Sequence, residues 1–558
     1  MSHSPTLFKS ALLKSAAAHS SDRRNPEESS DDAASIASYT SEPSLQTAKE
    51  ELIEQANAAP APGLQRPPIT KTFSVPTTTT TASSGKHSIT YQLNKHRRIL
   101  FKARMSKFDI SNPETSSDTF RGFYTLFWIV MGIYIIQSGV RCYEQEGVVL
   151  SLGFFRLFSK DGLALLISDM AMVATTVTSV MFSKLLVWGV IPYEPVGVVL
   201  QHVCQTVFLF LNIYWTFWRE WPWVQSGFFT LHTIVMMMKM HSYTSLNGEL
   251  SIRYRRLKYL KEHVPKWITE HKGDNDDSSK SQELKEMETE MTFLEDELVH
   301  GNVRFPDNVT LLNYLDYLLV PSLVYALEYP PIFTEFPSVL RIRPWYVLEK
   351  SLATLGSFLL LYVTTERYIL PKLYDPDMSD FRVIVELLFP FMINYLFIFY
   401  IIFECILNAF AELSRFADRN FYDDWWNSVS YDEFARKWNK PVHQWLLRHV
   451  YAQSMESYQL SKWNATLVTF LFSSCLHELV LVIVTRRVRM YLFAMQMFQL
   501  PLIVLGQHPL VRKHSTTGNV LLWLGMFIGL PLLAILYCRE AFWSDAMFGV
   551  GDQTIDHQ

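Results

Sequence analysis

Nine apolar stretches of about 20 residues constrain the fold of this chain more than any other feature. An α-helix rises about 1.5 Å per residue, so each stretch is long enough to cross the roughly 30 Å hydrocarbon core of a bilayer. We therefore predict an all-α, polytopic membrane protein with about nine transmembrane helices. The predicted spans are 122–140, 162–182, 195–217, 223–240, 345–364, 383–410, 464–484, 488–507 and 518–538.

The composition agrees with a membrane protein. Of the 558 residues, 49% are hydrophobic, 14% aromatic and only 19% charged, against about 25% charged in soluble domains. The five cysteines show no CxxC spacing, so they predict neither a disulfide framework nor a structural zinc. With no metal-ligand cluster and a net charge of −4, we predict no metal and no nucleic-acid partner.

The regions outside the spans define the remaining organisation. Residues 1–90 are rich in Ser, Thr, Ala and Pro and predict a disordered region. Residues 91–121 form a basic, amphipathic juxtamembrane segment containing KHRRILFKARMSK. Lys and Arg beside the first span predict a cytosolic N-terminus, and the polar beginning indicates no secretory signal peptide. We expect a single membrane domain over 122–540 and a tail over 541–558.

One further apolar piece, 309–329, is difficult to place. It carries Asn313, Asp316 and Pro321, so we interpret it as interfacial or re-entrant rather than spanning. If it crossed the membrane, the 411–463 segment would move to the opposite face. The RRVR cluster at 486–489 opposes the predicted topology, because it would lie on the luminal side.

A histidine lies near the middle of the 464–484 span. His477 follows Thr466 and Ser473 at helical spacing, so the three form a polar stripe that we expect to face an interior or cavity. Desolvation is expected to lower the pKa of the imidazole and keep it neutral, which leaves one ring nitrogen as a general base. The alternative is a structural histidine hydrogen-bonded to a neighbouring helix.

The 411–463 segment is too charged to span a bilayer and too aromatic for an ordinary linker. Its rings suit a membrane interface; they belong to Phe421, Tyr422, Trp425, Trp426, Trp438 and Trp445. Its cationic or imidazole side chains are able to contact phosphates; they are Arg436, His443, Arg448 and Lys462. Asn439 is able to stabilise an oxyanion, although such an Asn is more often a cap or turn residue.

Other polar positions favour structural roles. Glu404, Asn408 and Glu412 recur every four residues and predict an interhelical hydrogen-bonded seam. Asp424 is expected to accept hydrogen bonds from backbone amides. The polar residues of 241–247 predict an interfacial cap of the fourth span, without a catalytic role.

These residues alone leave two classes of function open. One is a membrane enzyme with an intramembrane base, and the other is a transporter with a proton-binding histidine. A transporter predicts inverted repeats and paired broken helices, and the sequence shows no such symmetry.

Three motifs in order resemble the membrane-bound O-acyltransferase family, and within it the sterol O-acyltransferase branch of fungal type. They are FYDDWWN at 421–427, WNKPVH at 438–443 and SSCLHEL at 473–479. The resemblance implies transfer of a fatty acyl group from acyl-CoA to the 3β-hydroxyl of a sterol, ergosterol in particular, to make storage esters. It implies a multi-pass protein of the endoplasmic reticulum membrane, assembled as a homodimer or homotetramer, with acyl-CoA as co-substrate and no further cofactor.

The resemblance also implies roles for individual residues. His477 matches the catalytic histidine and Asn439 the second catalytic residue. The residues that match acyl-CoA contacts are Arg436, His443, Tyr451, Lys462 and Ser473. The signature residues, with structural roles, are Phe421, Tyr422, Asp424, Trp425, Trp426 and Asn427. Animal sterol members carry His where Glu404 stands, so no role is transferred to Glu404.

The nearest alternative is a diacylglycerol O-acyltransferase making triacylglycerol, which shares these three elements. LNAFAE at 407–412 followed by Arg415 and Phe416 favours the sterol branch.

Overall fold

The computed structural model describes residues 101–109, 112, 115, 117, 121–149, 159–270, 278–329, 342–506 and 515–539. The predicted disordered region 1–90 and the tail 541–558 lie outside the described residues.

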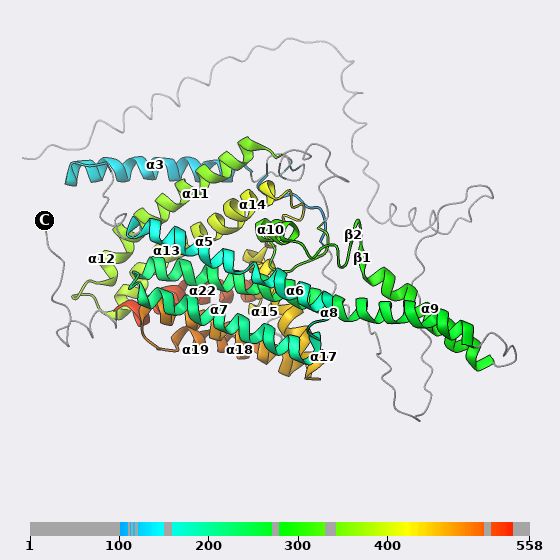
Figure 1. Cartoon of the computed structure of the whole chain (residues 1–558). Coiled ribbons are helices and arrows are strands. Elements are labelled where there is room, and N and C mark those ends of the chain that lie inside the picture. Colours follow the sequence, from blue (N-terminus) through cyan, green and yellow to red (C-terminus); the bar gives the residue numbers. More distant parts are fainter. Residues whose placement is uncertain are drawn as a thin grey trace, which may run out of the picture. The chain divides into compact units, whose positions relative to one another are not determined.

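The described chain is almost entirely helical (Figure 1). In the first part, the elements are α3 (Arg121–Glu146), α5 (Gly162–Thr175), α6 (Thr178–Trp188), η1 (Tyr193–Gly197), α7 (Val198–Trp218), α8 (Trp223–Glu270), α9 (Ser278–Glu297), β1 (Val299–His300), β2 (Val303–Arg304) and α10 (Leu311–Leu319). The two short strands are antiparallel, with Val299 opposite Arg304.

The second part continues with further helices, π-helical turns and a short 3₁₀ helix. These are α11 (Pro344–Thr364), η4 (Thr365–Ile369), α12 (Leu370–Leu373), α13 (Asp380–Phe399), η5 (Tyr400–Ile406), α14 (Leu407–Leu413), η6 (Trp425–Asn427), α15 (Tyr431–Trp438), α16 (Lys440–Leu446), η7 (Leu447–Ala452), α17 (Gln453–Ser457), α18 (Lys462–Thr485), α19 (Tyr491–Met497), α20 (Gln499–Gly506), α22 (Ser515–Ala534) and η8 (Ile535–Arg539).

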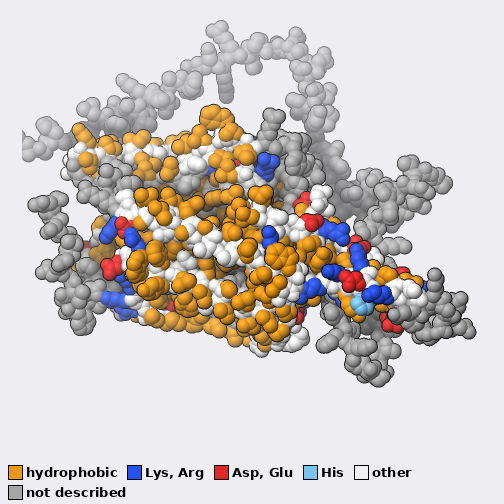
Figure 2. All heavy atoms as spheres, in the orientation of Figure 1, with side chains coloured by type: hydrophobic (Ala, Val, Ile, Leu, Met, Phe, Trp, Pro, Cys, Tyr) orange, Lys and Arg blue, Asp and Glu red, His pale blue; other side chains and the backbone are white. Residues whose placement is uncertain are grey.

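Seven helices in the described part are long and apolar enough to cross a membrane. They are Gly122–Gln145, Gly162–Trp188, Tyr193–Trp218, Pro344–Leu373, Asp380–Leu413, Lys462–Thr485 and Ser515–Arg539. Apolar side chains cover most of the helical face seen in Figure 2. The predicted all-α polytopic class is confirmed, whereas the count of nine is not.

The two predicted spans that differ are 223–240 and 488–507. The first is the beginning of a 48-residue helix, α8, that continues through the basic run to Glu270. The second is divided into α19 and α20, which together form an apolar stretch too short to count with the seven. Hydropathy alone predicted where apolar residues occur, but backbone hydrogen bonding decided where each helix ends.

Helix α8 is the central element of one group of helices. It contacts α5, α6, α7 and α18, and beyond them its C-terminal half pairs with α9 as a helical hairpin (Figure 1). Ion pairs Arg253–Glu297 at 3.1 Å and Arg256–Glu290 at 2.9 Å join the two hairpin helices. Charged side chains gather on this hairpin in Figure 2, which agrees with a segment outside the apolar core of a bilayer.

The segment 309–329 contains only the nine-residue helix α10, followed by an irregular, mostly buried stretch. Buried Lys239 of α8 donates from Nζ to the carbonyls of Tyr317, Leu318 and Val320 at 2.9, 3.2 and 2.7 Å. These bonds satisfy carbonyls that the end of a helix leaves without intrahelical partners. A nine-residue helix rises about 14 Å, so it agrees with the expected non-spanning segment.

Helices α11, α13, η5 and α22 form a second group, in which α13 packs against α22 and α11 against η5. The aromatic segment 416–446 contacts both groups. Phe421 and Trp425 pack with Phe399 and Phe403 of the second group, and Trp445 packs with Ile234 of α8. This segment is therefore the part of the protein in which the predicted functional residues meet the helical scaffold.

Candidate active site

His477 lies in α18 with its side chain exposed, and its Nδ1 is 2.8 Å from the backbone carbonyl of Ser473. A carbonyl oxygen only accepts, so Nδ1 must carry the hydrogen. In the neutral ring, Nε2 is then the unprotonated nitrogen, with a lone pair directed away from its own helix. Packing within the described part of the protein leaves this imidazole exposed, on a helix long and apolar enough to cross a membrane.

The neighbouring residue anchors this part of α18. Glu478 is buried, and its carboxylate accepts from the backbone amides of Met490 and Phe493 at 2.8 and 3.0 Å. It also accepts from the Tyr537 hydroxyl at 2.8 Å. One side chain thus ties α18 to the start of α19 and to η8, which fixes the helix that carries His477.

Asn439 separates α15 from α16. Its side chain accepts a hydrogen bond from the backbone amide of Val442 at 3.2 Å, so it is the N-cap of α16. This is the cap role that its residue type favours. The side-chain amide nitrogen has no partner among the residues that the structure describes, and it remains available as a donor.

The FYDDWWN segment forms an aromatic cluster inside the protein. Phe421, Tyr422 and Trp425 are buried, and Trp425 contacts Phe399 and Trp438 edge-to-face with ring centroids 5.2 and 4.9 Å apart. The prediction that the aromatic rings of 421–445 lie at a lipid interface is therefore wrong for the buried ones. Rings that satisfy an interface also satisfy a protein interior with polar groups at its edge, so residue type did not distinguish the two.

Helix α22 holds the second half of the same motif through residues that sequence reasoning missed. Asn519 Nδ2 donates to the carbonyls of Trp426 and Ser428 at 2.8 and 2.9 Å, and Trp523 Nε1 donates to Trp426 at 3.2 Å. An Asn and a Trp in an apolar span, four residues apart, were the available signal, because polar groups there face protein partners.

Two ion pairs connect the acidic residues of the motif to the following helices. Asp423 accepts from Lys440 at 2.9 Å, and Asp424 lies 3.0 Å from Lys437. Burial alone would raise the pKa of Asp423, but the hydrogen bond and charge of Lys440 outweigh it, and the net pKa is lowered. Asp424 makes no side-chain cap of the helical turn that follows it. The prediction that it satisfies backbone amides at that turn is therefore wrong, because its carboxylate lies against an ammonium instead.

The residues predicted to contact acyl-CoA come from consecutive elements that contact one another, α15 to α18. Arg436 is exposed and pairs with Asp432 at 2.7 Å. His443 is half-buried, and burial lowers its pKa, with a further lowering by the charge of Arg436. Tyr451 lies in η7, while Lys462 begins α18 and is exposed; Ser473 is one turn before His477.

Helix α8 supports this region from the other side. Trp445 Nε1 donates to the carbonyl of Met238 at 2.9 Å, and His449 Nε2 is 2.9 Å from the Ser242 hydroxyl. His241 lies edge-on to His449 with ring centroids 5.0 Å apart. The residues of 241–247 were predicted to cap a span, which is wrong, because α8 continues past them and buries most of them.

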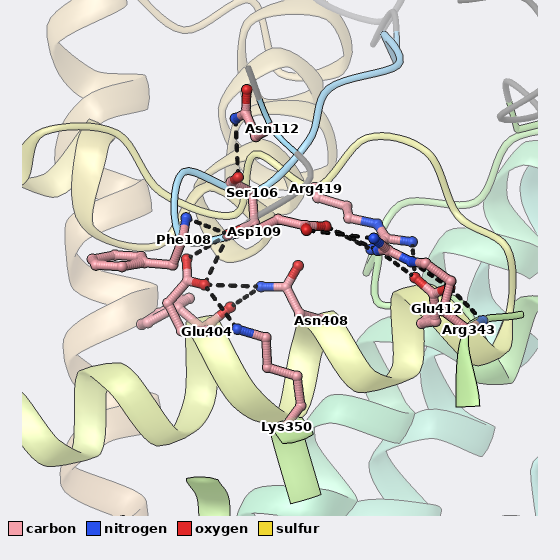
Figure 3. Close-up of polar contacts among 11 residues, drawn as sticks. Ser106, Phe108, Asp109, Asn112, Arg343, Lys350, Glu404, Asn408, Glu412 and Arg419 are labelled. Atoms are coloured by element: carbon pink, nitrogen blue, oxygen red, sulfur yellow. Dashed lines mark hydrogen bonds and ion pairs between the residues drawn. The ribbon is translucent and has the colours of Figure 1, made fainter. Parts of the chain in front are cut away.

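Glu404, Asn408 and Glu412 line one side of a buried polar network (Figure 3). Glu404 accepts from Tyr422 at 2.6 Å and lies 3.9 Å from Lys350. Glu412 accepts from Arg343, directly before α11, at 3.1 Å and from Arg419 at 2.6 Å. The three residues do form a buried polar seam, but the hydrogen bonds of its two carboxylates run to irregular segments of the described chain, and the contact with another helix is the ion pair of Glu404 with Lys350 of α11.

The fold and the site together define a class of protein. It is a polytopic helical membrane protein with a histidine on an apolar helix whose Nε2 is able to accept a proton. Comparison with known proteins identifies the family. The model of the membrane-bound O-acyltransferase family matches residues 195–539. The chain belongs to the membrane-bound O-acyltransferase family.

Individual relatives agree with this assignment. "Probable sterol O-acyltransferase 1" of Schizosaccharomyces pombe is 36% identical over 489 residues, covering 80% of this chain and 89% of the relative. "Sterol O-acyltransferase 2" of Candida albicans is 30% identical over 493 residues, covering 80% and 79%. "Diacylglycerol O-acyltransferase 1" of Dictyostelium discoideum is 34% identical over 244 residues, covering only 42% and 38%.

Proposed function

We propose that this chain is an acyl-CoA-dependent sterol O-acyltransferase that esterifies the 3β-hydroxyl of a sterol, with ergosterol as the preferred acceptor. The family match makes it an acyltransferase, and the fungal relatives that cover most of its length carry sterol O-acyltransferase names. The diacylglycerol O-acyltransferase relative aligns with less than half of the chain, which favours the sterol as acceptor.

The observation that carries the chemistry is the hydrogen bond from His477 Nδ1 to the Ser473 carbonyl. It leaves Nε2 of an exposed imidazole as a proton acceptor. We assign His477 as the general base: Nε2 takes the sterol hydroxyl proton while the sterol oxygen attacks the thioester carbonyl carbon. The resulting tetrahedral intermediate expels the CoA sulfur, which takes the proton from the imidazolium, so the products are the steryl ester and CoA.

Asn439 is assigned the second catalytic position. Its oxygen is used as the cap of α16, and its Nδ2 group is a donor suited to the developing charge on the thioester oxygen. The elements from α15 to α18 are assigned to acyl-CoA. Arg436 and Lys462 are able to pair with the phosphates of acyl-CoA. His443, Tyr451 and Ser473 are able to hydrogen-bond its uncharged parts.

The apolar helices place the protein in a bilayer, and we propose the endoplasmic reticulum membrane with a cytosolic N-terminus. We further propose a homodimer or homotetramer, with no metal and no cofactor other than the co-substrate acyl-CoA.

The test is acyl transfer from labelled oleoyl-CoA in membranes that lack other acyltransferases. Ergosterol, cholesterol and diacylglycerol are offered separately, with His477→Ala as the inactive control and Cys475→Ala, an exposed neighbour on α18, as the matched control. Labelled steryl ester that disappears only in His477→Ala supports the proposal. Labelled triacylglycerol overturns the acceptor, and undiminished turnover in folded His477→Ala overturns the base.

A further inference from the structure

The short segment before the first span packs against the protein and buries Ser106 and Asp109. Arg104 forms a parallel bridge with Asp418: its amide donates to the Ala417 carbonyl at 2.9 Å, and its carbonyl accepts from the Arg419 amide at 3.0 Å. Its guanidinium also contacts the Asp418 carboxylate, with Nε 3.1 Å from Oδ1. Residues 101–109, which precede the membrane domain in sequence, are thereby joined to the loop that leads into the FYDDWWN motif.

Two side chains of this segment enter the buried polar network (Figure 3). Asp109 pairs with Arg343 at 2.9 Å. Ser106 is 2% exposed, and its hydroxyl is 3.0 and 2.8 Å from the two carboxylate oxygens of Glu404, which is 1% exposed. A buried carboxylate requires hydrogen-bond donors, and the Ser106 hydroxyl is one donor to Glu404.

The same carboxylate holds the motif. The Tyr422 hydroxyl donates to Glu404 Oε1 at 2.6 Å. Glu404 therefore lies between Ser106 and Tyr422, with Asn408 Nδ2 at 3.5 Å and Lys350 Nζ at 3.9 Å completing its surroundings. A change in one donor alters the position of the shared acceptor and hence the other hydrogen bond.

Tyr422 is in turn connected to the backbone on both sides of Asn439. The amide of Asp423 donates to the Lys437 carbonyl at 2.9 Å, and the amide of Lys440 donates to the Phe421 carbonyl at 3.0 Å. The residues flanking Tyr422 thus bracket the residue that caps α16. Hydrogen bonds join Ser106 and Tyr422 to Glu404, and the backbone on either side of Tyr422 is in turn bonded to the backbone on either side of Asn439.

We propose that Ser106 is a positioning residue for acyl transfer, acting through Glu404 and Tyr422 on the placement of Asn439. This inference rests on the proposed function. A residue that only stabilises the fold lowers the amount of folded protein and its melting temperature. A positioning residue lowers kcat of the folded protein and leaves the KM for acyl-CoA nearly unchanged, since a small displacement near the reacting groups affects the transition state most.

The experiment measures kcat and KM for oleoyl-CoA, per folded molecule, with the full chain in detergent. The variants are Ser106→Ala, Tyr422→Phe and the double variant. Ser414→Ala and Tyr143→Phe are the matched controls, because Tyr143 is exposed and the half-buried Ser414 hydroxyl donates to the Phe410 carbonyl rather than to Glu404. We expect each single variant to lower kcat about tenfold with KM changed less than about twofold. The controls are expected to match the wild type.

The double variant tests the connection itself. If both residues act through one carboxylate, the double variant is no slower than the slower single variant; independent effects multiply instead. Glu404→Gln, which keeps an acceptor for Tyr422, is expected to retain more activity than Glu404→Leu. Multiplying effects, or a Ser106→Ala enzyme with lower melting temperature and unchanged kcat, overturn the inference and leave the proposed function intact. A wild-type protein that forms no steryl ester overturns the proposed function itself.

Discussion

The side-chain amide of Asn519 donates to the backbone carbonyl of Trp426 over 2.8 Å, joining α22 to the FYDDWWN motif. The same amide reaches the carbonyl of Ser428 at 2.9 Å. An irregular segment such as 423–430 has carbonyls that no helix satisfies, so a side chain from a neighbouring span is needed. The motif therefore depends on a helix about 90 residues later in the chain.

Replacement of Asn519 by Ala is expected to lower the free energy of unfolding by about 1–3 kcal/mol, because the carbonyl of buried Ser428 loses its donor and that of Trp426 keeps the bond from Trp523. Thermal unfolding of the detergent-solubilised protein, followed by tryptophan fluorescence, measures the change. Asn464→Ala, at an exposed position of α18, is the control. Equal melting temperatures for the two variants would contradict the structural role of Asn519.

Gly518→Ala tests the close approach of the same two segments. A Cβ at Gly518 would lie 2.4 Å from the carbonyl oxygen of Val429, a backbone atom that moves only with its segment. We expect a loss of about 1–3 kcal/mol from overpacking. Gly529→Ala on the same helix meets only Met495 at 3.6 Å, so it is expected to be neutral or slightly stabilising. Melting temperatures of the two variants that fall together would contradict this interpretation.

Lys239→Met removes the donor to three carbonyls. Two belong to the last turn of α10 and the third to Val320, directly after it. Met has a similar length but cannot donate, so we expect a loss of stability of about 2–3 kcal/mol. Limited proteolysis between 318 and 329 should also become faster than in wild type. The exposed Lys258→Met, on the same helix, provides the comparison. Unchanged protection of 318–329 in Lys239→Met would show that these hydrogen bonds do not hold the segment.

The ion pair of Asp423 with Lys440 predicts a pH dependence of stability. The pKa of Asp423 in the folded protein is lowered from its ordinary value of 3.8. A lowered pKa stabilises the folded state above the ordinary value, and this stabilisation is lost as the pH falls toward the folded value.

Wild type should therefore melt above Asp423→Asn at pH 7, and the difference should shrink as the pH is lowered through about 4. Asp296→Asn, at an exposed position of the hairpin, serves as the reference for general acid effects. A difference that stayed constant or grew on acidification would contradict the stabilising ion pair.

Apolar periodicity and length were sufficient to predict the helical membrane class and most of the spans. The 464–484 span and its His477 were placed correctly in α18, because a run of hydrophobic residues in a bilayer has no alternative to helix. The cap role of Asn439 also follows from residue type, since a short polar side chain before Lys-Pro favours a helix start. These features depend on neighbours in sequence.

Features that depend on distant residues were not predictable in the same way. The burial of Phe421, Tyr422 and Trp425 and the continuation of α8 through its basic half both differ from the prediction. Aromatic and amphipathic residues satisfy either a lipid interface or a protein interior, so their sequence leaves both open.

The sequence by itself determined that this chain forms membrane-spanning helices and that a histidine lies within one of them. Only the tertiary structure decided that Ser106 and Tyr422 share the carboxylate of Glu404. It also decided that Asn519 bonds to the FYDDWWN motif. The physical reason is that helix formation and membrane insertion depend on local composition. Hydrogen bonding of a buried polar group depends instead on which distant segment packing brings within about 3 Å of it.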